Sequence, residues 1–416
     1  MRSGAYLDLL RTNSDFRRLW TAQLISLGGD WFNSVALLGL VIDLTGSGLA
    51  ASLVLAASLL PQFLFAPIAG PLADRLDRRK VMIVCDLARA ALALGMLAVR
   101  SQDAVWIGIL CLAGISTFGA FFQPASGAAL PNLVGASQLA PANALMGATW
   151  GVMLAIGAAV GGVVATVFGR DVAFILNAAS FAWSALLIVR VRGRFKEDED
   201  APRRVHPIKD IREGLSYARS DRKVLALIAT KGGFGLGVGV IALLPIFAKD
   251  VFDAGDTGIG FLFAARGIGA LLGPFGARAL VGDSDRRLFI AIGASMALYG
   301  VAYFVFPFMP GILPAAAIAI VAHLGGGAQW LLSSFGLQKM TQDHMRGRIL
   351  ALDLGLVSLT MSLSVLGAGK LADLFDPRLV MIGFASVEIV YAIVWLSATR
   401  SLWAAPKAAA GMSAEG

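Results

Sequence analysis

Several ionisable side chains stand inside long apolar stretches, and four of them are the first candidates for chemistry. They are Asp30, Lys231, Arg266 and His323. If these stretches cross a membrane, each charge at the bilayer centre costs about 3 kcal/mol on insertion scales. Such residues are therefore rare unless they bind something or pair with each other. Their types favour proton transfer or the binding of a charged ligand group.

Asp30 lies twelve residues beyond Arg18, near the middle of the first apolar stretch. A carboxyl group there could carry a proton. It could equally pair with a nearby cation or present a fixed charge to a ligand. Arg266, in "FLFAARGIGALLG", could hold an anionic substrate group or neutralise an acid.

Lys231 and His323 each have an ordinary structural alternative. Lys231 is eight residues beyond Lys223, so its long side chain could reach the membrane surface. His323 could be a hydrogen-bonded core residue. Gln329 and Trp330 follow it two turns later, and the three side chains together would also suit the wall of a polar cavity.

Other residues are expected to be structural. Asp86 and Arg89, three apart, are expected to satisfy each other, and Glu388 lies in the last apolar stretch. The two cysteines, Cys85 and Cys111, both lie in apolar stretches and are expected to be small buried hydrophobic residues.

The sequence favours neither an enzyme nor a metal protein. A Ser-His-Asp arrangement, a metal-binding pair of histidines and a phosphate-binding Gly-Lys-Ser/Thr sequence are all missing from the chain. We therefore expect no catalysis, no cofactor and no metal ion. Without a nucleotide-binding motif, an ion gradient is the expected source of energy.

The elements that position these residues follow from composition. The chain has 416 residues, of which 57% are hydrophobic and 15% are charged, whereas a soluble chain carries about 25% charged residues. A helix needs about 20 apolar residues to cross a bilayer. Twelve stretches qualify, centred near Ser26, Leu60, Leu92, Ser116, Ala155, Ser180, Gly237, Ile268, Gly293, His323, Ser362 and Val387.

A long polar loop divides the spans into two groups of six. We expect an N-terminal six-helix bundle at 1–190, a cytoplasmic central loop at 191–222, a C-terminal six-helix bundle at 223–402 and a flexible tail at 403–416. From Pro207 onward the central loop places apolar residues on one helical face, which predicts a surface amphipathic helix. The alternative is a disordered linker.

The basic residues indicate how the chain is oriented. Most of the 35 Lys and Arg residues fall in the termini, the central loop and the loops that follow even-numbered spans. Cytoplasmic loops are enriched in these residues, so both termini are expected in the cytoplasm. The net charge of +8 comes in short clusters rather than in a long patch with interleaved aromatic residues, which argues against nucleic-acid binding.

The densest cluster is "GPLADRLDRRKVM", between the second and third spans. It holds six charges in seven positions, from Asp74 to Lys80. Part of it recurs in the eighth span, "IGALLGPFGARAL", as a less complete copy of the same pattern. Two repeated six-helix halves are typical of a secondary transporter that binds its substrate between the repeats. The alternative is that the cluster only sets topology and binds anionic lipid head groups.

The Gly-x-x-x-Asp-Arg spacing, followed by a basic run, resembles the signature of the major facilitator superfamily between helices 2 and 3. Asp77 is a departure, because the family usually has glycine there. "RTNSDFRRLWTAQLISLGGDW", "FFQPASGAALPNLV" and "RGRILAL" are similar to the branch that includes macrolide-efflux proteins and the enterobactin exporter. This resemblance implies an all-α integral membrane protein with twelve transmembrane helices in two pseudo-symmetric six-helix bundles.

The resemblance also implies residue roles. In the superfamily Asp74 would meet the start of helix 11, near Gly347, and close the cytoplasmic side. The implied cytoplasmic gating motif is Gly70, Asp74, Arg75, Arg78 and Arg79. Helices 1, 4, 7 and 10 line the central cavity in the superfamily. The candidates for proton coupling or for the substrate cavity are Asp30, Arg266, Lys231, His323, Gln329 and Trp330.

Two departures bear on proton coupling. Gly157, Gly161 and Gly162 in "GAAVGGVV" resemble the superfamily's antiporter signature Gly-Pro-x-x-Gly-Gly, with Ala158 in place of the proline. Ordinary helix packing is the alternative for such small residues. Many proton-driven exporters carry an arginine on helix 4, which "WIGILCLAGISTFGAFF" lacks.

The implied function is export of small amphipathic molecules, of the drug, macrolide or siderophore type, by alternating access and proton-coupled antiport. The expected partners are a small-molecule substrate, protons and membrane lipids. The expected form is a monomer in the inner membrane. Uptake or lysophospholipid transport by the same fold is an alternative, and a non-transporting sensor or scaffold is a third.

Overall fold

The computed structural model describes residues 4–193, 195, 207–282 and 284–403. Within these residues the chain is helical and contains no strand. Twelve of the helices are long and apolar enough to cross a membrane, which confirms the expected fold class. Most of the connection at 191–206 and the tail at 404–416 lie outside the described residues.

The N half contains six long helices, preceded by the short helix α1 (Gly4–Thr12). Asn13 caps the first long helix by accepting a hydrogen bond from the Phe16 amide at 2.9 Å. The long helices are α2 (Ser14–Thr45), α3 (Gly48–Arg75), α4 (Arg78–Gly95), α5 (Val105–Leu133), α6 (Ala136–Val167) and α7 (Arg170–Val189).

The C half contains the other six spans, and its first span is interrupted. That span consists of α9 (Arg222–Gly237), α10 (Val240–Ile246) and the π-helical turn η3 (Phe247–Val251). The remaining spans are α11 (Gly255–Val281), α12 (Asp285–Val305), α13 (Ile312–Met340), α14 (Asp343–Ala372) and α15 (Pro377–Trp403).

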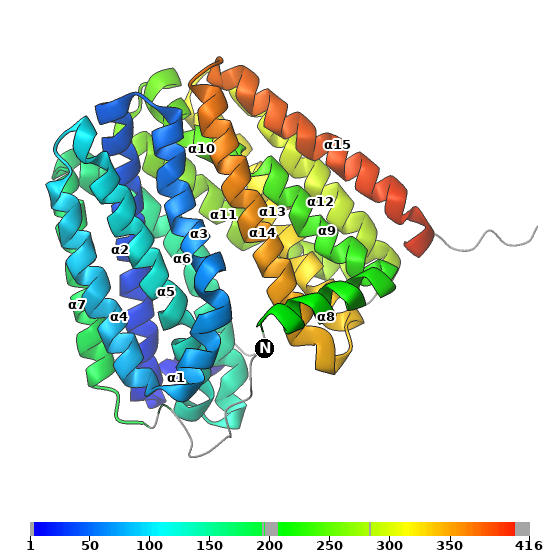
Figure 1. The fold of residues 1–416 in the computed structure, drawn as a ribbon, viewed down its shortest axis with the longest axis horizontal. Helices are drawn as coiled ribbons and strands as arrows, with labels where there is room; N and C mark the ends of the chain where they lie inside the picture. The colour runs from blue at the N-terminus through cyan, green and yellow to red at the C-terminus, as the bar shows by residue number, and fades with distance from the viewer. Residues whose placement is uncertain (1–3, 194, 196–206, 283, 404–416) are drawn as a thin grey trace, which may run out of the picture.

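A polar helix, α8 (Pro207–Ser220), crosses the C half at the end where α9 begins (Figure 1). It docks on the start of α14 through a Glu213–Arg348 ion pair of 3.0 Å. The amide of Gln342 also donates to the Tyr217 hydroxyl at 3.3 Å. This segment is thus a helix packed on the protein.

Asp77 explains how the chain turns between α3 and α4. Its carboxylate accepts hydrogen bonds from the amides of Arg79 at 2.9 Å and Lys80 at 3.3 Å, and so caps α4. An acid at this position also interacts favourably with the helix dipole. The residue that departs from the superfamily pattern therefore has a local structural role.

The two halves meet at one end of the molecule. We call this the Asp43 end, and we call the opposite end, where α3 leads into α4, the Asp77 end. In Figure 1 the ribbons of the two halves come together at the top, which is the Asp43 end, and diverge toward α1 and α8. Two antiparallel helix pairs, α6 with α11 and α3 with α14, carry this contact.

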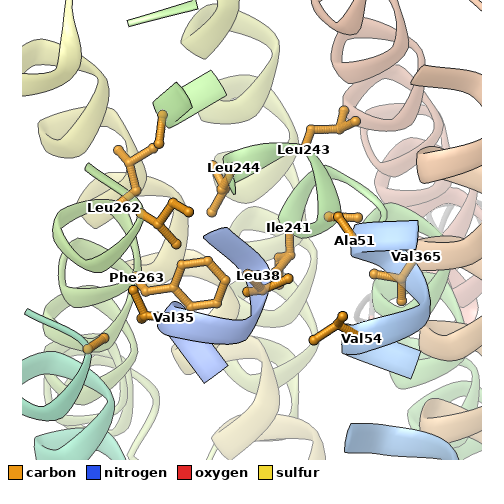
Figure 2. Packing of buried hydrophobic residues seen from close by; sticks show 14 of the residues in the cluster. Val35, Leu38, Ala51, Val54, Ile241, Leu243, Leu244, Leu262, Phe263 and Val365 are labelled. Carbon is orange, nitrogen blue, oxygen red and sulfur yellow. The ribbon is translucent and has the colours of Figure 1, made fainter. Parts of the chain in front are cut away.

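Apolar side chains fill the region where the halves meet. Figure 2 shows Val35 and Leu38 of α2 beside Ile241 of α10 and Phe263 of α11. These side chains are buried and belong to one continuous core cluster that includes residues of both halves. Burial of apolar groups therefore holds the halves together at the Asp43 end.

Candidate transport site and gate

A buried charge cluster lies inside the N half. Arg89 of α4 donates to Asp30 of α2 at 2.9 Å and to Asp86 of its own helix at 3.1 Å. Ser184 of α7 donates to the second oxygen of Asp86 at 2.6 Å. The expected pairing of Asp86 with Arg89 is present, and Asp30 joins it as a second acid.

The members of this cluster differ in access to solvent. The Asp86 side chain is 0% exposed and that of Arg89 is 7% exposed, whereas that of Asp30 is 27% exposed. The Arg89 guanidinium also lies over the Phe181 ring, 4.0 Å from its centroid. Two carboxyl groups thus share one fixed cation, and only Asp30 reaches open space. This cluster can bind one proton without creating an unbalanced charge.

A second polar cluster lies inside the C half. Arg266 of α11 donates through Nε to Nε2 of His323 on α13 at 3.2 Å. The Tyr303 hydroxyl of α12 shares that same nitrogen at 2.9 Å. Among the described residues no carboxylate lies within ion-pair distance of Arg266. Its positive charge is therefore left for another partner.

The position of Arg266 on α11 places it away from lipid. One exposed stripe runs along this helix, formed by Phe261, Ile268, Leu272 and Phe275. At about 100° per residue, Arg266 lies roughly 150° from the centre of that stripe. Gly269, on the same side as Arg266, packs directly against His323. The partial exposure of Arg266 therefore faces the protein interior.

Lys231 is buried and paired, so it does not reach the membrane surface. Its ammonium group lies 2.5 Å from Asp353 of α14 and 2.9 Å from the Ser334 hydroxyl of α13. It also lies 4.6 Å from the centroid of the Trp330 ring. Asp353 is not among the residues predicted from the sequence, although an acid inside an apolar stretch is a visible signal.

Gln329 has one satisfied and one unsatisfied polar atom. Its amide nitrogen donates to the Thr230 carbonyl of α9 at 3.1 Å, whereas its oxygen is buried without a partner among the described residues. Trp330, the next residue, is half-exposed. Together with Lys231, these side chains connect α9, α13 and α14 within the C half.

A network of four charges joins the halves at the Asp43 end. Arg170 of the N half donates to both oxygens of Asp256 in the C half, at 2.6 and 3.0 Å. Arg170 also pairs with Asp43 at 2.5 Å. Lys249, in η3 of the C half, pairs with Asp43 and donates to the Gly39 carbonyl at 3.0 Å. Two acids and two bases thus balance one another across the interface.

A helix cap forms the second polar contact between the halves. Asp373, just beyond α14, accepts hydrogen bonds from the Gly48 amide at 2.5 Å, the Leu49 amide at 3.2 Å and the Ser47 hydroxyl at 2.9 Å. It therefore occupies the N-terminus of α3, where a carboxylate is favoured. A hydrogen bond from Thr257 to Thr166 also joins the halves at this end. All hydrogen bonds between the halves that join two described residues lie at the Asp43 end.

The glycines of α6 allow close approach of three helices. Gly157 and Gly161 lie against α2, and Gly162 lies against α11. A Cβ atom at Gly162 would stand 2.7 Å from the Asp256 carbonyl oxygen and 3.1 Å from the Gly260 Cα. These residues are packing positions at which a larger side chain would separate the helices.

The arginines at the start of α4 contact backbone carbonyls of their own half. Arg78 donates to the carbonyls of Ala128 and Phe195 at 2.8 and 3.0 Å. Arg79 donates to Gly193 at 3.1 Å and lies over the Phe195 ring. The backbone of Gly70, Asp74 and Arg75 is helical, but their side chains lie outside the described ones.

A sequence profile described as "transmembrane secretion effector" matches residues 9–408. The chain belongs to this family of the major facilitator superfamily. Among its relatives is the multidrug efflux pump Tap of Mycolicibacterium fortuitum, which is 28% identical over 85% of this chain and 88% of the pump. Macrolide efflux protein A of Streptococcus pyogenes is 24% identical over 86% of this chain and 89% of that protein.

Solved structures of other major facilitator transporters share the fold. A bacterial homolog of the human lysosomal transporter Spinster, in an inward-facing and unoccupied conformation, matches with a TM-score of 0.73 and 14% identity. That match covers 94% of this chain and 98% of that one. A POT family transporter matches with a TM-score of 0.76 and 9% identity, over 94% and 96% of the two chains. This protein is thus a multi-pass transporter of the major facilitator type that has efflux pumps among its relatives.

Proposed function

We propose that this transporter exports small amphipathic molecules from the cytoplasm in exchange for protons. The observation that carries the proposal is the cluster of Asp30, Arg89 and Asp86, in which two carboxyl groups share one guanidinium. Only Asp30 has access to open space. Protonation of Asp30 and binding of a substrate can therefore bias the same conformational equilibrium in opposite directions.

The names of the relatives and the basic loops support the proposed direction of transport. Efflux is the stated activity of Tap and of macrolide efflux protein A. With both termini in the cytoplasm of a bacterial inner membrane, the Asp77 end faces inward and the Asp43 end faces outward. The conformation described above, closed by Arg170, Asp256 and Asp373, is then the inward-facing one. A monomer contains all the parts that this scheme needs.

The opposite conformation would be closed by the signature motif. Gly70, Asp74, Arg75, Arg78 and Arg79 would then meet the start of α14, as the superfamily pattern implies. Asp373 at the other end supports this idea, since it shows one acid at the end of α14 binding the first amides of α3. Asp74 at the end of α3 would bind the first amides of α14 in the same way.

We further propose that the six candidate residues of the cavity have different roles. Asp30 carries the proton, and Arg266 with His323 receives an anionic or hydrogen-bond-accepting group of the substrate. The relative positions of α9, α13 and α14 next to this group are fixed by Lys231, Gln329 and Trp330. Gly162 lets α6 slide against α11, and Gly157 and Gly161 let α6 pack closely on α2.

Purified transporter in liposomes with an imposed pH gradient tests the proposal. The probe is a panel of fluorescent macrolides, cationic dyes and anionic dyes. We expect accumulation of at least one class only while the gradient lasts, with proton movement in the opposite direction. Equal accumulation after the gradient is dissipated with a protonophore would contradict proton-coupled export.

A further inference from the structure

Glu388 of α15 is a buried acid for which the transport scheme has no use. It is 0% exposed, and neither of its carboxylate oxygens has a hydrogen-bond partner among the described residues. It stands against Gly237, where a Cβ atom would come within 2.5 Å of its Oε2. An ionised carboxylate in such a place would be strongly unfavourable.

The packing of α15 along α9 brings Glu388 to this position. The Trp395 indole donates to the Ala226 carbonyl at 2.8 Å, and the Tyr391 hydroxyl donates to the Ala229 carbonyl at 2.8 Å. The next turn of α15 carries Glu388, which reaches the last residue of α9. Side chains of α15 thus supply hydrogen-bond donors to α9, and a protonated Glu388 would continue the series.

The helix is interrupted beside Glu388. The amide of Gly239 donates to the Ser364 hydroxyl at 2.9 Å, although a continuous helix would direct it to the Gly235 carbonyl. The amide of Ile241 bonds the Val238 carbonyl at 2.8 Å, not that of Gly237. Carbonyl oxygens released by a broken membrane helix are typical of proton and ion sites in transporters.

The segment beyond this break belongs to the contact between the halves. Ile246, at the end of α10, packs against Gly48 of the N half. Lys249, in the following turn, pairs with Asp43. If α10 and η3 move relative to α9 when the Asp43 end opens, the break is the place where the helix can bend.

Among the described residues, the groups that surround Glu388 include no cation. Gly237 of α9 and Ser364 of α14 flank the break, and α10 consists of apolar residues. Tyr299 of α12 and Tyr391 of α15 are the titratable groups within electrostatic reach. The Tyr299 hydroxyl is itself buried without a partner in the described structure.

We propose that Glu388 is a second proton-binding site, which is protonated while the Asp43 end is closed and releases its proton when α10 moves away from α9. In that step the carboxyl O–H bond breaks and the proton passes to a water molecule that enters at the break. The ligand is the proton itself. The site is separate from Asp30 and does not depend on Asp30 as the transport site.

Linkage fixes the sign of the expected pH effect. Because the closed form holds the proton, acidification favours closure and alkalinisation favours opening, by at most about tenfold in the closed-to-open ratio per pH unit. The charge network of Asp43, Arg170, Lys249 and Asp256 can add its own pH dependence. The test therefore rests on the difference between wild type and Glu388→Gln.

Distances between two spin labels measure closure. Ser101→Cys and Arg378→Cys place labels on exposed residues of the two halves at the Asp43 end, in protein whose Cys85 and Cys111 are replaced. We expect the closed fraction of the parent in nanodiscs to fall as the pH rises. Glu388→Gln should remain closed over the same range. The matched control is Asp8→Asn, an exposed acid on α1 at the opposite end of the molecule, which should follow the parent.

An infrared difference spectrum provides a second measurement. We expect the parent at acidic pH to show the C=O stretch of a protonated buried carboxyl group, and Glu388→Gln to lack this band. An unchanged band, or a Glu388→Gln variant that opens with pH as the parent does, would overturn the proposal. A closed fraction that responds to Na⁺ instead of pH would also overturn it. Loss of transport in Asp30→Asn leaves these outcomes unaffected, so the two proposals fail separately.

Discussion

Arg170, the first residue of α7, binds Asp256 in the first turn of α11 through two hydrogen bonds, of 2.6 and 3.0 Å. This pair is a direct polar bond between the two halves. Its side chains are only 22% and 6% exposed, so solvent screens the interaction weakly. Asp43 and Lys249 surround the pair and balance its charges. Release of this network is therefore part of the polar cost of opening the Asp43 end, together with release of the Asp373 cap.

Arg170→Gln should shift the transporter away from the conformation closed at the Asp43 end. The change removes charged hydrogen bonds to Asp256 and Asp43, which contribute about 2 kcal/mol together. The closed-to-open ratio should fall roughly thirtyfold. Spin labels at residues 101 and 378 would report the change as a longer distance.

Arg100→Gln is the matched control for this change. Arg100 lies at the same end and pairs with Asp171 at 2.9 Å, but both residues belong to the N half. The side chains are 62% and 48% exposed, so the pair contributes about 0.5 kcal/mol or less. An equal shift in both variants would show that the closed-to-open ratio depends on net charge and not on the bond between the halves.

Gly162→Ala should disturb the contact between α6 and α11. The added methyl group would meet backbone atoms of Asp256 and Gly260, which cannot rotate away. We expect the two helices to separate, with a cost of about 1–3 kcal/mol to the closed form. Gly147→Ala on the same helix meets nothing within 4 Å and should leave closure and transport unchanged.

Lys231→Met should destabilise the C half, because it leaves the buried Asp353 without its cation. Removing one partner of a buried ion pair costs about 3–5 kcal/mol. Thermal unfolding in detergent should show a clear fall in Tm. The double variant Lys231→Met with Asp353→Leu should recover most of the loss, since apolar residues can replace a buried pair. A double variant less stable than the single one would contradict this account.

Lys223→Met provides the comparison on the surface. Lys223 pairs with Asp285 at 3.0 Å, with side chains 40% and 36% exposed. Screening by solvent limits such a pair to roughly 1 kcal/mol. The Tm of the Lys223→Met variant should stay close to that of the parent protein.

Arg266→Gln should change which substrates are transported. Without its positive charge, the cluster with His323 and Tyr303 cannot neutralise an anionic substrate group. We expect the apparent affinity for anionic dyes to fall at least about tenfold, and that for neutral macrolides to change little. Arg266→Lys should restore part of the loss. Equal losses for every substrate class would indicate that Arg266 only stabilises the fold.

The fold could be read from the sequence because membrane burial leaves a strong signal. Long apolar stretches predict the spans, and short basic clusters mark their ends. The break between α9 and α10 was not visible, because Gly237 and Gly239 resemble the many packing glycines of this chain. Which glycine interrupts a helix depends on partners such as Ser364 from a distant span.

The candidate site was only partly predictable. Isolated charges such as Asp30 and Arg266 stand out in apolar sequence, but their partners depend on how each helix is rotated. Asp353 pairs with Lys231 across 122 positions, and no spacing rule connects them. Arg170 and Asp256 lie at helix ends, where a charge in the sequence indicates topology and not a partner. Their contact exists because two helices of different halves begin at the same place.

Exchange and net transport must be compared directly in Asp30→Asn, because the central claim is that Asp30 couples proton movement to transport. Counterflow of labelled substrate in liposomes needs no net proton movement, whereas accumulation against a gradient does. We predict that Asp30→Asn keeps counterflow near the wild-type rate and loses accumulation driven by the pH gradient. Gradient-driven accumulation at the wild-type rate in Asp30→Asn would contradict the account.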